Sequence, residues 1–332
     1  MDFEIFTIDC AKGDGCLCRE NFDKQIAAEL DPLREEYKSS GRFPKVGGFI
    51  IDMSKITCCD NYGCLGIILL SELIADKFGS ALRFMFPPNG DFLRDFTSGG
   101  FYQLLADYFY STGANCDLAY SEPNPSRRFV NCRIETRADL RHFIFRAISV
   151  HRDFLSQNKN DIQGLHVKSA HERINPCLTI SMELAQNIIE HSQFGTNRKP
   201  SGYTSLLFTP NQVEIAAMDL GIGIPQSLGY RATDPNESYL AIIEACKYQV
   251  SGKKDKGGLG LFFTHKDVKK LGGDMSIRSG RATVLFTSSN QYRGEFIKGY
   301  ETPFFLGTQI QLTLPLNKSR EEIDNGFEVL DF

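Results

Sequence analysis

The chain has 332 residues, 42% of them hydrophobic and 23% charged, which is typical of a globular protein with about two domains. Lys and Arg total 37 against 41 Asp and Glu, and this formal net charge of -4 disfavours nucleic-acid binding, because no basic excess is available to neutralise phosphates. The acidic start and the lack of an apolar run of about 20 residues disfavour a signal peptide and a membrane span, so we expect a cytoplasmic protein that does not bind membranes.

Alternation of short apolar strands with amphipathic helices before residue 120 predicts a small α/β domain. The expected helices cover residues 23–38, 62–78 and 99–110, and the expected strands cover 46–52, 81–86 and 116–120. Residues 121–126 read Ser-Glu-Pro-Asn-Pro-Ser and predict a linker, because each proline restricts itself and its predecessor to extended conformations. We therefore expect a first domain of residues 1–125, a second of residues 126–318 and an acidic tail of residues 319–332.

The second domain is expected to contain an amphipathic helix over residues 137–157, which is also a candidate homodimer surface. Asn175 and Pro176 predict the start of the next helix, with Asn as the N-cap and Pro at the first helical position. A hairpin, a helix and further strands follow. The hairpin and later strands are expected over 203–208, 213–219, 275–279, 282–288 and 309–314, with a helix over 261–271 and a long loop before the last strand.

Cysteines are frequent, but their spacing contains no C-x-x-C pair among the ten. Two interpretations are open. The ordinary interpretation is that the cysteines are reduced and mostly buried thiols, and the alternative is that some of them bind zinc.

A polar motif lies on the helix that follows Pro176. Glu183, Asn187 and His191 step by four residues, so they share one face of a helix and the carboxylate and the amide point into the same space. A solvated helix face is the alternative interpretation. For His191, a role near a bound phosphate and a helix-capping role are both open.

A second motif follows the strand over residues 213–219. Because strand side chains alternate, Asp219 lies on the apolar face, where a carboxylate is costly unless it is hydrogen-bonded. Thr308 shares its strand face with apolar residues in the same way. Gly221 and Gly223 allow a close approach of the backbone to a ligand.

A third motif, Lys256-Gly257-Gly258-Leu259-Gly260-Leu261, leads into the helix that starts at Leu261. The unpaired N–H groups and the positive dipole end of that helix favour anionic phosphates. The motif differs from a P-loop and from a Rossmann turn in its spacing. The charged run over residues 251–256 is either a contact for a γ-phosphate or a solvated group of lysines.

Together with Gly307 and Thr308, these motifs resemble the N, G1 and G2 boxes of the GHKL superfamily of ATPases. The resemblance implies a Bergerat-fold α/β sandwich over residues 126–318, with a mixed, largely antiparallel sheet, and it implies ATP and Mg²⁺ as cofactors. Residues 226–256 would form the ATP lid. The residues expected to bind the cofactors are Asn187, Asp219, Gly221, Gly223, Lys256, Gly257, Gly258, Leu259, Gly260, Leu261 and Thr308.

The resemblance also implies a role for each polar side chain. Glu183 is the expected general base, which orients or deprotonates the attacking water or hydroxyl. The Asn187 amide oxygen is the expected Mg²⁺ ligand, since this ion prefers oxygen ligands. Asp219 is expected to accept a hydrogen bond from the exocyclic amine of adenine, aided by an ordered water that the Thr308 hydroxyl also reaches.

The first domain resembles a STAS domain over roughly residues 10–115. The similarity lies in Phe49-Ile-Ile-Asp52 and in Cys59-Asp60-Asn61-Tyr62-Gly63, which follows the pattern of STAS antagonists of anti-sigma factor kinases. Where those antagonists carry a phosphorylatable serine, this chain has Asn61, which cannot accept a phosphoryl group. The resemblance therefore implies either a STAS-like domain that keeps the interaction surface but lacks the phosphorylation switch, or one in which Asn61 permanently resembles the unphosphorylated, binding-competent form.

These observations predict an ATP- and Mg²⁺-binding regulator related to anti-sigma factor serine kinases. It would act as an ATPase or as a serine/threonine protein kinase on a protein partner, such as a STAS-domain or regulatory protein. The alternative is a nucleotide-gated interaction module in which hydrolysis is incidental. A histidine kinase is disfavoured because His142 and His151 lack the expected acidic context. Relatives that need a domain after the sandwich are disfavoured because about 17 residues follow Pro315.

Overall fold

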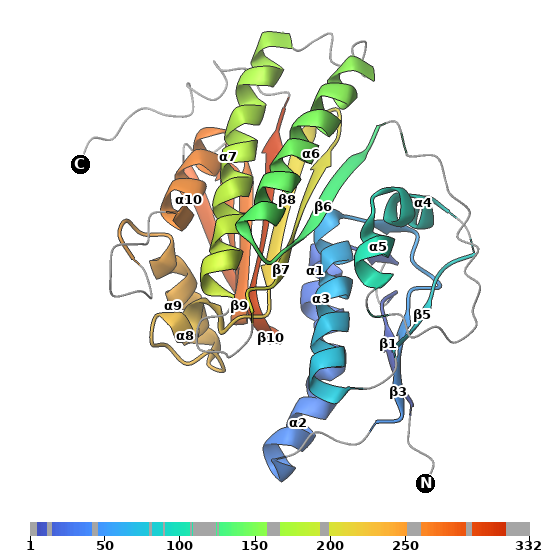
Figure 1. Cartoon of the computed structure of the whole chain (residues 1–332). Coiled ribbons are helices and arrows are strands. Elements are labelled where there is room, and N and C mark those ends of the chain that lie inside the picture. Colours follow the sequence, from blue (N-terminus) through green and yellow to red (C-terminus); the bar gives the residue numbers. More distant parts are fainter. Residues whose placement is uncertain are drawn as a thin grey trace. The chain divides into compact units, whose positions relative to one another are not determined.

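A computed structural model describes residues 5–11, 15–41, 46–79, 82–88, 90–106, 108, 124, 126–157, 167–192, 199–250, 260–289 and 294–316. The protein is a mixed α/β protein with parallel and antiparallel sheets (Figure 1). It divides into two compact units. Unit 1 is Met1–Asn124 with Thr302–Phe305, and unit 2 is Pro125–Glu301 with Leu306–Phe332. Within the described ranges, no helix is both long and apolar enough to cross a bilayer.

Unit 1 is built on a parallel sheet of three strands in the order β1-β3-β5, with a separate parallel pair of β2 and β4. Its strands are β1 (Ile5–Asp9), β2 (Cys16–Leu17), β3 (Gly48–Asp52), β4 (Cys58–Cys59) and β5 (Leu82–Met85). Its α-helices are α1 (Arg19–Asn21), α2 (Asp31–Ser40), α3 (Asn61–Phe78), α4 (Asp91–Ser98) and α5 (Phe101–Ala106). A π-helical turn, Phe22–Ile26, and a 3₁₀ turn, Ala27–Leu30, join α1 to α2.

Helix α3 forms the centre of unit 1, and thirteen of its residues are buried. The Asp60 side chain caps its start by accepting a hydrogen bond from the Gly63 backbone N–H at 2.6 Å. Gly79, with φ of 58°, ends it in the left-handed conformation that glycine adopts readily. Asn61, the first residue of α3, is fully buried.

The predicted elements of unit 1 are largely present, with differences at their ends. The predicted helix over 23–38 is part of a longer helical run from Arg19 to Ser40, and the helix predicted over 99–110 is limited to α5 among the described residues. Helix α4 was not predicted. The strand predicted over 116–120 lies outside the described residues.

Unit 2 contains a five-stranded sheet in the order β6-β7-β8-β10-β9. Its strands are β6 (Arg128–Ile134), β7 (Gly202–Phe208), β8 (Gln212–Asp219), β9 (Asp274–Ser289) and β10 (Gly294–Pro315). Its helices are α6 (Arg137–Gln157), α7 (Val167–His191), α8 (Gly223–Ser227), α9 (Pro235–Ala245) and α10 (Gly260–Lys270). The pairings β6–β7, β7–β8 and β8–β10 are antiparallel. Helices α6, α7 and α10 lie over one face of this sheet (Figure 1).

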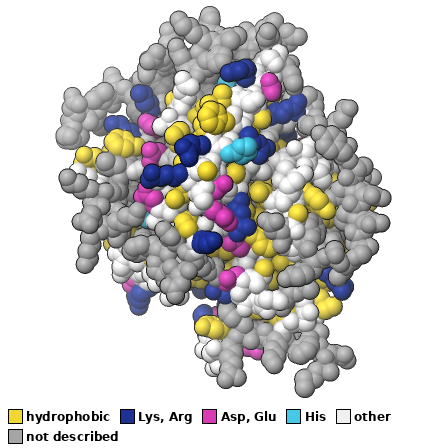
Figure 2. Space-filling model, in the orientation of Figure 1, with side chains coloured by type: hydrophobic (Ala, Val, Ile, Leu, Met, Phe, Trp, Pro, Cys, Tyr) yellow, Lys and Arg dark blue, Asp and Glu magenta, His cyan; other side chains and the backbone are white. Residues whose placement is uncertain are grey.

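The core of unit 2 forms where these helices pack on alternate strand residues. The buried cluster includes Val213, Ile215 and Ala217 from β8, and Ile180, Leu184 and Ile188 from α7. Spacing of two residues along a strand and of three or four along a helix places each set on one face. The outer faces of α6 and α7 carry intermixed apolar and charged side chains, including the exposed Phe145, Ile148 and Met182 (Figure 2).

Three sequence predictions for unit 2 were wrong. Helix α7 begins at Val167, so Asn175 does not cap it and Pro176 lies inside it. Proline removes one helical hydrogen bond, but tertiary packing of the apolar stripe of α7 maintains the helix through that point. The sequence predicted two strands with a break over residues 280–281, but the structure has one continuous strand, β9. Gly280 adopts a φ of 65° within it, a conformation that glycine accepts readily. The predicted long loop before the last strand is largely strand β10, since that strand starts at Gly294.

Candidate functional site

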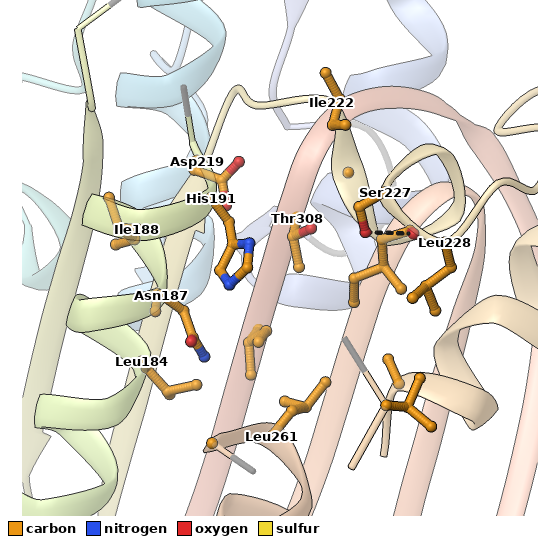
Figure 3. A pocket seen from close by; sticks show the side chains of 17 residues that line it. Leu184, Asn187, Ile188, His191, Asp219, Ile222, Ser227, Leu228, Leu261 and Thr308 are labelled. Carbon is orange, nitrogen blue, oxygen red and sulfur yellow. Dashed lines mark hydrogen bonds between the residues drawn. The ribbon is translucent and has the colours of Figure 1, made fainter. Parts of the chain in front are cut away.

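A cavity of about 140 Å³ lies in unit 2 between α7, β8, the turn into α8, the start of α10 and β10 (Figure 3). Its walls are mainly apolar, with Leu184, Ile188 and Ala217 among them. An engineered apolar cavity of about 150 Å³ accepts one benzene molecule, so this volume suits a flat ring system. The cavity also brings together predicted site residues from five elements: Asn187, His191, Asp219, Gly223, Gly260, Leu261 and Thr308.

Asn187 of α7 and the start of α10 lie toward one end of this cavity, here called the α7 end, whereas His191, the last residue of α7, lies toward Asp219. Figure 3 shows the Asn187 amide and the His191 ring directed into the cavity. Glu183, one turn earlier, is exposed and lies outside the cavity lining. A Cβ atom added to Gly260 would lie 3.1 Å from Glu183 Oε2 and 3.6 Å from Asn187 Oδ1. The carboxylate and the amide therefore converge on the first residue of α10, as the four-residue spacing predicts.

Glu183 and Asn187 have unused hydrogen-bonding capacity. In the part of the chain that the structure describes, neither side chain forms a hydrogen bond or ion pair. Gly260, the first described residue of α10, has no side chain that would fill the space next to Glu183 and Asn187. A small hydrated cation placed here would meet the oxygen acceptors of Glu183 and Asn187. His191 is the last residue of α7, so its position agrees with either interpretation of its role.

Asp219 occupies the other end of the cavity, at the last residue of β8. Its carboxylate is half-buried, and burial raises its pKa to about 6, although hydrogen bonds from the backbone N–H groups of Gly221 and Thr308 act in the opposite direction. The bond from Gly221 N to Asp219 Oδ1 is 2.7 Å long. An ionised carboxylate has about four acceptor positions, so two backbone donors leave capacity for a ligand donor.

Glycines allow the backbones around Asp219 to approach one another. Gly307 has φ of 80°, and a Cβ atom there would lie 2.0 Å from the backbone oxygen of Asp219. Gly223 has φ of 79°, and a Cβ atom there would lie 2.7 Å from Ser279 Oγ. Both positions therefore require glycine for conformational and for steric reasons. A Cβ atom at Gly221 would lie 2.9 Å from Asp219 Oδ1.

Ser279 is a further site residue, which the sequence analysis missed. This buried side chain on β9 donates a hydrogen bond to Gly307 O at 2.8 Å and accepts one from Ile224 N at 2.9 Å. Its oxygen also lies 3.3 Å from the Thr308 hydroxyl. Ser279 thus connects the first turn of α8 to the start of the β10 segment that lines the cavity. No sequence signal identifies it, because its partners lie 55 and 28 residues away and are chiefly backbone atoms.

Some predicted residues cannot be placed. Lys256, Gly257, Gly258 and Leu259 lie outside the described residues, as does the whole charged run over residues 251–256. Helix α9 occupies part of the segment expected to form a lid and was not predicted. Among the described residues, no group of three or more His, Cys, Asp or Glu side chains is arranged to hold a metal ion.

Comparisons with known proteins identify no relative of this chain. No protein-family model, no curated protein and no solved structure matches it.

Proposed function

We propose that unit 2 is an ATP- and Mg²⁺-binding domain of the GHKL type with a Bergerat-fold sandwich. The observation that carries this proposal is the convergence of Glu183 and Asn187 on Gly260, beside a cavity that has Asp219 at its other end. The antiparallel pairings of the five-stranded sheet, with helices over one face, are compatible with such a sandwich.

The cavity fits the adenine base of ATP. Its volume suits one flat ring system, and its apolar walls favour burial of an aromatic surface. Asp219 supplies an acceptor for the exocyclic amine, and the glycines beside it let the backbone segments around this carboxylate pack closely. A buried carboxylate is costly without a donor, so a donor on the ligand would offset part of that cost.

The α7 end fits a magnesium-bound phosphate group. The Asn187 amide oxygen is a hard ligand of the kind that Mg²⁺ prefers, and this ion commonly takes one or two protein ligands beside phosphates and waters. The start of α10 adds backbone N–H donors for phosphate oxygens. The absence of a side chain at Gly260 leaves space next to both Glu183 and Asn187.

Bound ATP would supply a transferable γ-phosphate. Glu183 would orient a water or a partner hydroxyl and accept its proton, and its exposure leaves it accessible to either nucleophile. The domain would thus act as an ATPase or as a serine/threonine protein kinase. A nucleotide-gated interaction module is the second candidate, which would need the same cavity but no proton acceptor at Glu183.

Unit 1 would be a STAS-like domain without the phosphorylation switch. Its parallel β1-β3-β5 sheet and the helix that begins at Asn61 support this part of the proposal. Asn61 is fully buried and carries an amide, so we propose that unit 1 has no phosphoryl-acceptor role at this position.

Calorimetry with a non-hydrolysable ATP analogue and Mg²⁺ tests the binding proposal on the full chain. We expect saturable binding, and Asp219→Asn should weaken it about 10-fold or more, since loss of a charge-assisted hydrogen bond costs about 1.5–3 kcal/mol. The matched control is Asp153→Asn, an exposed aspartate on α6, which should bind like the original chain. Absence of binding by folded protein would overturn the proposal.

Phosphate transfer from γ-labelled ATP separates the two candidate functions. Label on a partner protein or on the chain itself supports a kinase, and release of free phosphate supports an ATPase. Binding without any turnover would favour the interaction module.

A further inference from the structure

Two cysteines of unit 1 are paired across neighbouring strands. The parallel pair β2–β4 has the register Cys16↔Cys58 and Leu17↔Cys59. Neighbouring strands lie about 4.8 Å apart, which is within the Cα–Cα range of about 4.4–6.8 Å that disulfides span. Both cysteines are thiols in the structure, and their side chains are joined by a hydrogen bond.

Backbone contacts on both sides hold this strand pair in register. Thr57 N donates to Gly15 O at 2.9 Å, and Asp60 N donates to Leu17 O at 3.0 Å. A Cβ atom at Gly63 would lie 2.2 Å from Leu17 O, so the first turn of α3 packs directly on β2. The two thiols therefore stay side by side in the folded protein, which gives a reaction between them a high effective concentration.

We propose that Cys16 and Cys58 form a modification site at which hydrogen peroxide converts the two thiols into one disulfide. Cys58 is exposed and reacts first: its sulfur displaces water from the peroxide and becomes a sulfenic acid. Cys16 sulfur then attacks the sulfenic sulfur, the S–S bond forms, and a second water leaves. The two thiols lose two electrons in total, and the peroxide is reduced to water.

The surroundings of the pair support this order of events. The pKa of the Cys16 thiol is raised, first by burial and then by its hydrogen bond to Cys58 and by the nearby Cys18, Cys58 and Asp60. A raised pKa lowers the thiolate fraction of Cys16, and a dissolved oxidant reaches this half-buried thiol less easily than the exposed Cys58. Cys59 lies on the opposite strand face and is buried, which separates it from both Cys16 and the solvent.

Peptide mapping of the full chain tests this proposal. The protein is reduced, freed of reductant, treated with hydrogen peroxide and blocked with N-ethylmaleimide before digestion and mass spectrometry. We expect the peptides that contain Cys16 and Cys58 to appear as one linked species, lighter than their sum by two hydrogens, which separates on reduction. Fragment ions of the original chain assign the linked sulfurs, so the test does not depend on any variant folding.

Variants identify the partner of Cys58 independently, because trypsin leaves Cys16 and Cys18 in one peptide, residues 13–19. Cys16→Ser and Cys58→Ser should lose the linked species, whereas the matched control Cys18→Ser should retain it. A link from Cys58 to Cys18 or Cys59, a link between two chains, or a Cys58 that is oxidised only to sulfinic acid would overturn the proposal. An unmodified Cys58 after peroxide treatment would overturn it as well.

Discussion

The two ends of the cavity in unit 2 differ in how they are held. At the Asp219 end, a network of hydrogen bonds joins the carboxylate, the Gly307 backbone and Ser279. At the α7 end, the side chains of Glu183 and Asn187 have no hydrogen-bond partner among the described residues. One end is therefore preorganised by the sheet, and the other has polar groups with unused capacity.

This difference separates recognition from chemistry. A preorganised end can select a ligand with little loss of side-chain entropy, because its groups are already ordered. Polar side chains without hydrogen-bond partners, such as those of Glu183 and Asn187, suit the part of a site where a metal ion, a phosphate and a nucleophile must enter and leave. Under the proposed function, changes at the Asp219 end should alter affinity and stability, and changes at the α7 end should alter turnover and magnesium dependence.

The largest effect is expected for Glu183→Gln. Removing the proton acceptor should lower ATP turnover about 10²- to 10⁴-fold, the usual contribution of a positioned acid or base. Nucleotide affinity should stay close to that of the original chain, and steady-state kinetics with calorimetry would show both. The control is Glu190→Gln on the same helix, which accepts a hydrogen bond from Gln186 outside the cavity. Equal turnover in the two variants would remove Glu183 from its proposed role.

Asn187→Ala should affect magnesium-dependent binding. Loss of the amide oxygen should weaken nucleotide binding about 10-fold in the presence of Mg²⁺, which corresponds to about 1.4 kcal/mol. Affinity measured with a chelator should change little, because the base end is intact. If the loss is the same with and without Mg²⁺, Asn187 is not the metal ligand.

Ser279→Ala tests the network at the sheet end. The change leaves Gly307 O and Ile224 N without their buried partner, and we expect a loss of about 1–3 kcal/mol in the free energy of unfolding. Ser276→Ala on the same strand is a matched control, because the Ser276 hydroxyl is buried without a hydrogen-bond partner in the described parts of the chain. Denaturant unfolding should show the control to be neutral or slightly stabilised. Similar losses in both variants would show that Ser279 has no special role.

The smallest effect concerns the pH dependence of stability. The folded pKa of Asp219 is about 6, whereas an unfolded aspartate titrates near pH 3.9. Between these values the folded state binds more protons, so the free energy of unfolding should fall as pH rises from about 4 to about 6. With screening of the half-buried group, the change should be about 1–2 kcal/mol. Asp219→Asn should lack this decrease, and an unchanged pH profile in that variant would contradict the assignment.

Much of the candidate site could be predicted from local spacing. The four-residue steps of α7 placed Asn187 and His191 in the cavity and Glu183 beside it, and strand alternation placed Asp219 and Thr308 in the same cavity. Element ends were harder to predict. Asn175-Pro176 has the form of a helix start, yet α7 continues through it, because packing of its apolar face on the sheet outweighs one missing hydrogen bond.

Other features depended on partners far along the chain. Strand β6 was not predicted, and it is stabilised by pairing with β7 from Arg128↔Phe208 to Ile134↔Gly202. The length of β10 likewise follows from its neighbours in the sheet rather than from its composition. Strand formation depends on cross-strand contacts more than on intrinsic preference, so a single sequence carries little information on these elements.

The sequence by itself determined which side chains share a helix or strand face, because the backbone repeat of each element is fixed by local geometry. Only the tertiary structure decided that α7, β8 and β10 enclose one cavity, that Ser279 connects two glycine-containing segments beside it, and that Cys16 lies next to Cys58. These arrangements depend on hydrogen bonds and packing between distant segments, whose free energies become favourable only when the whole unit is folded.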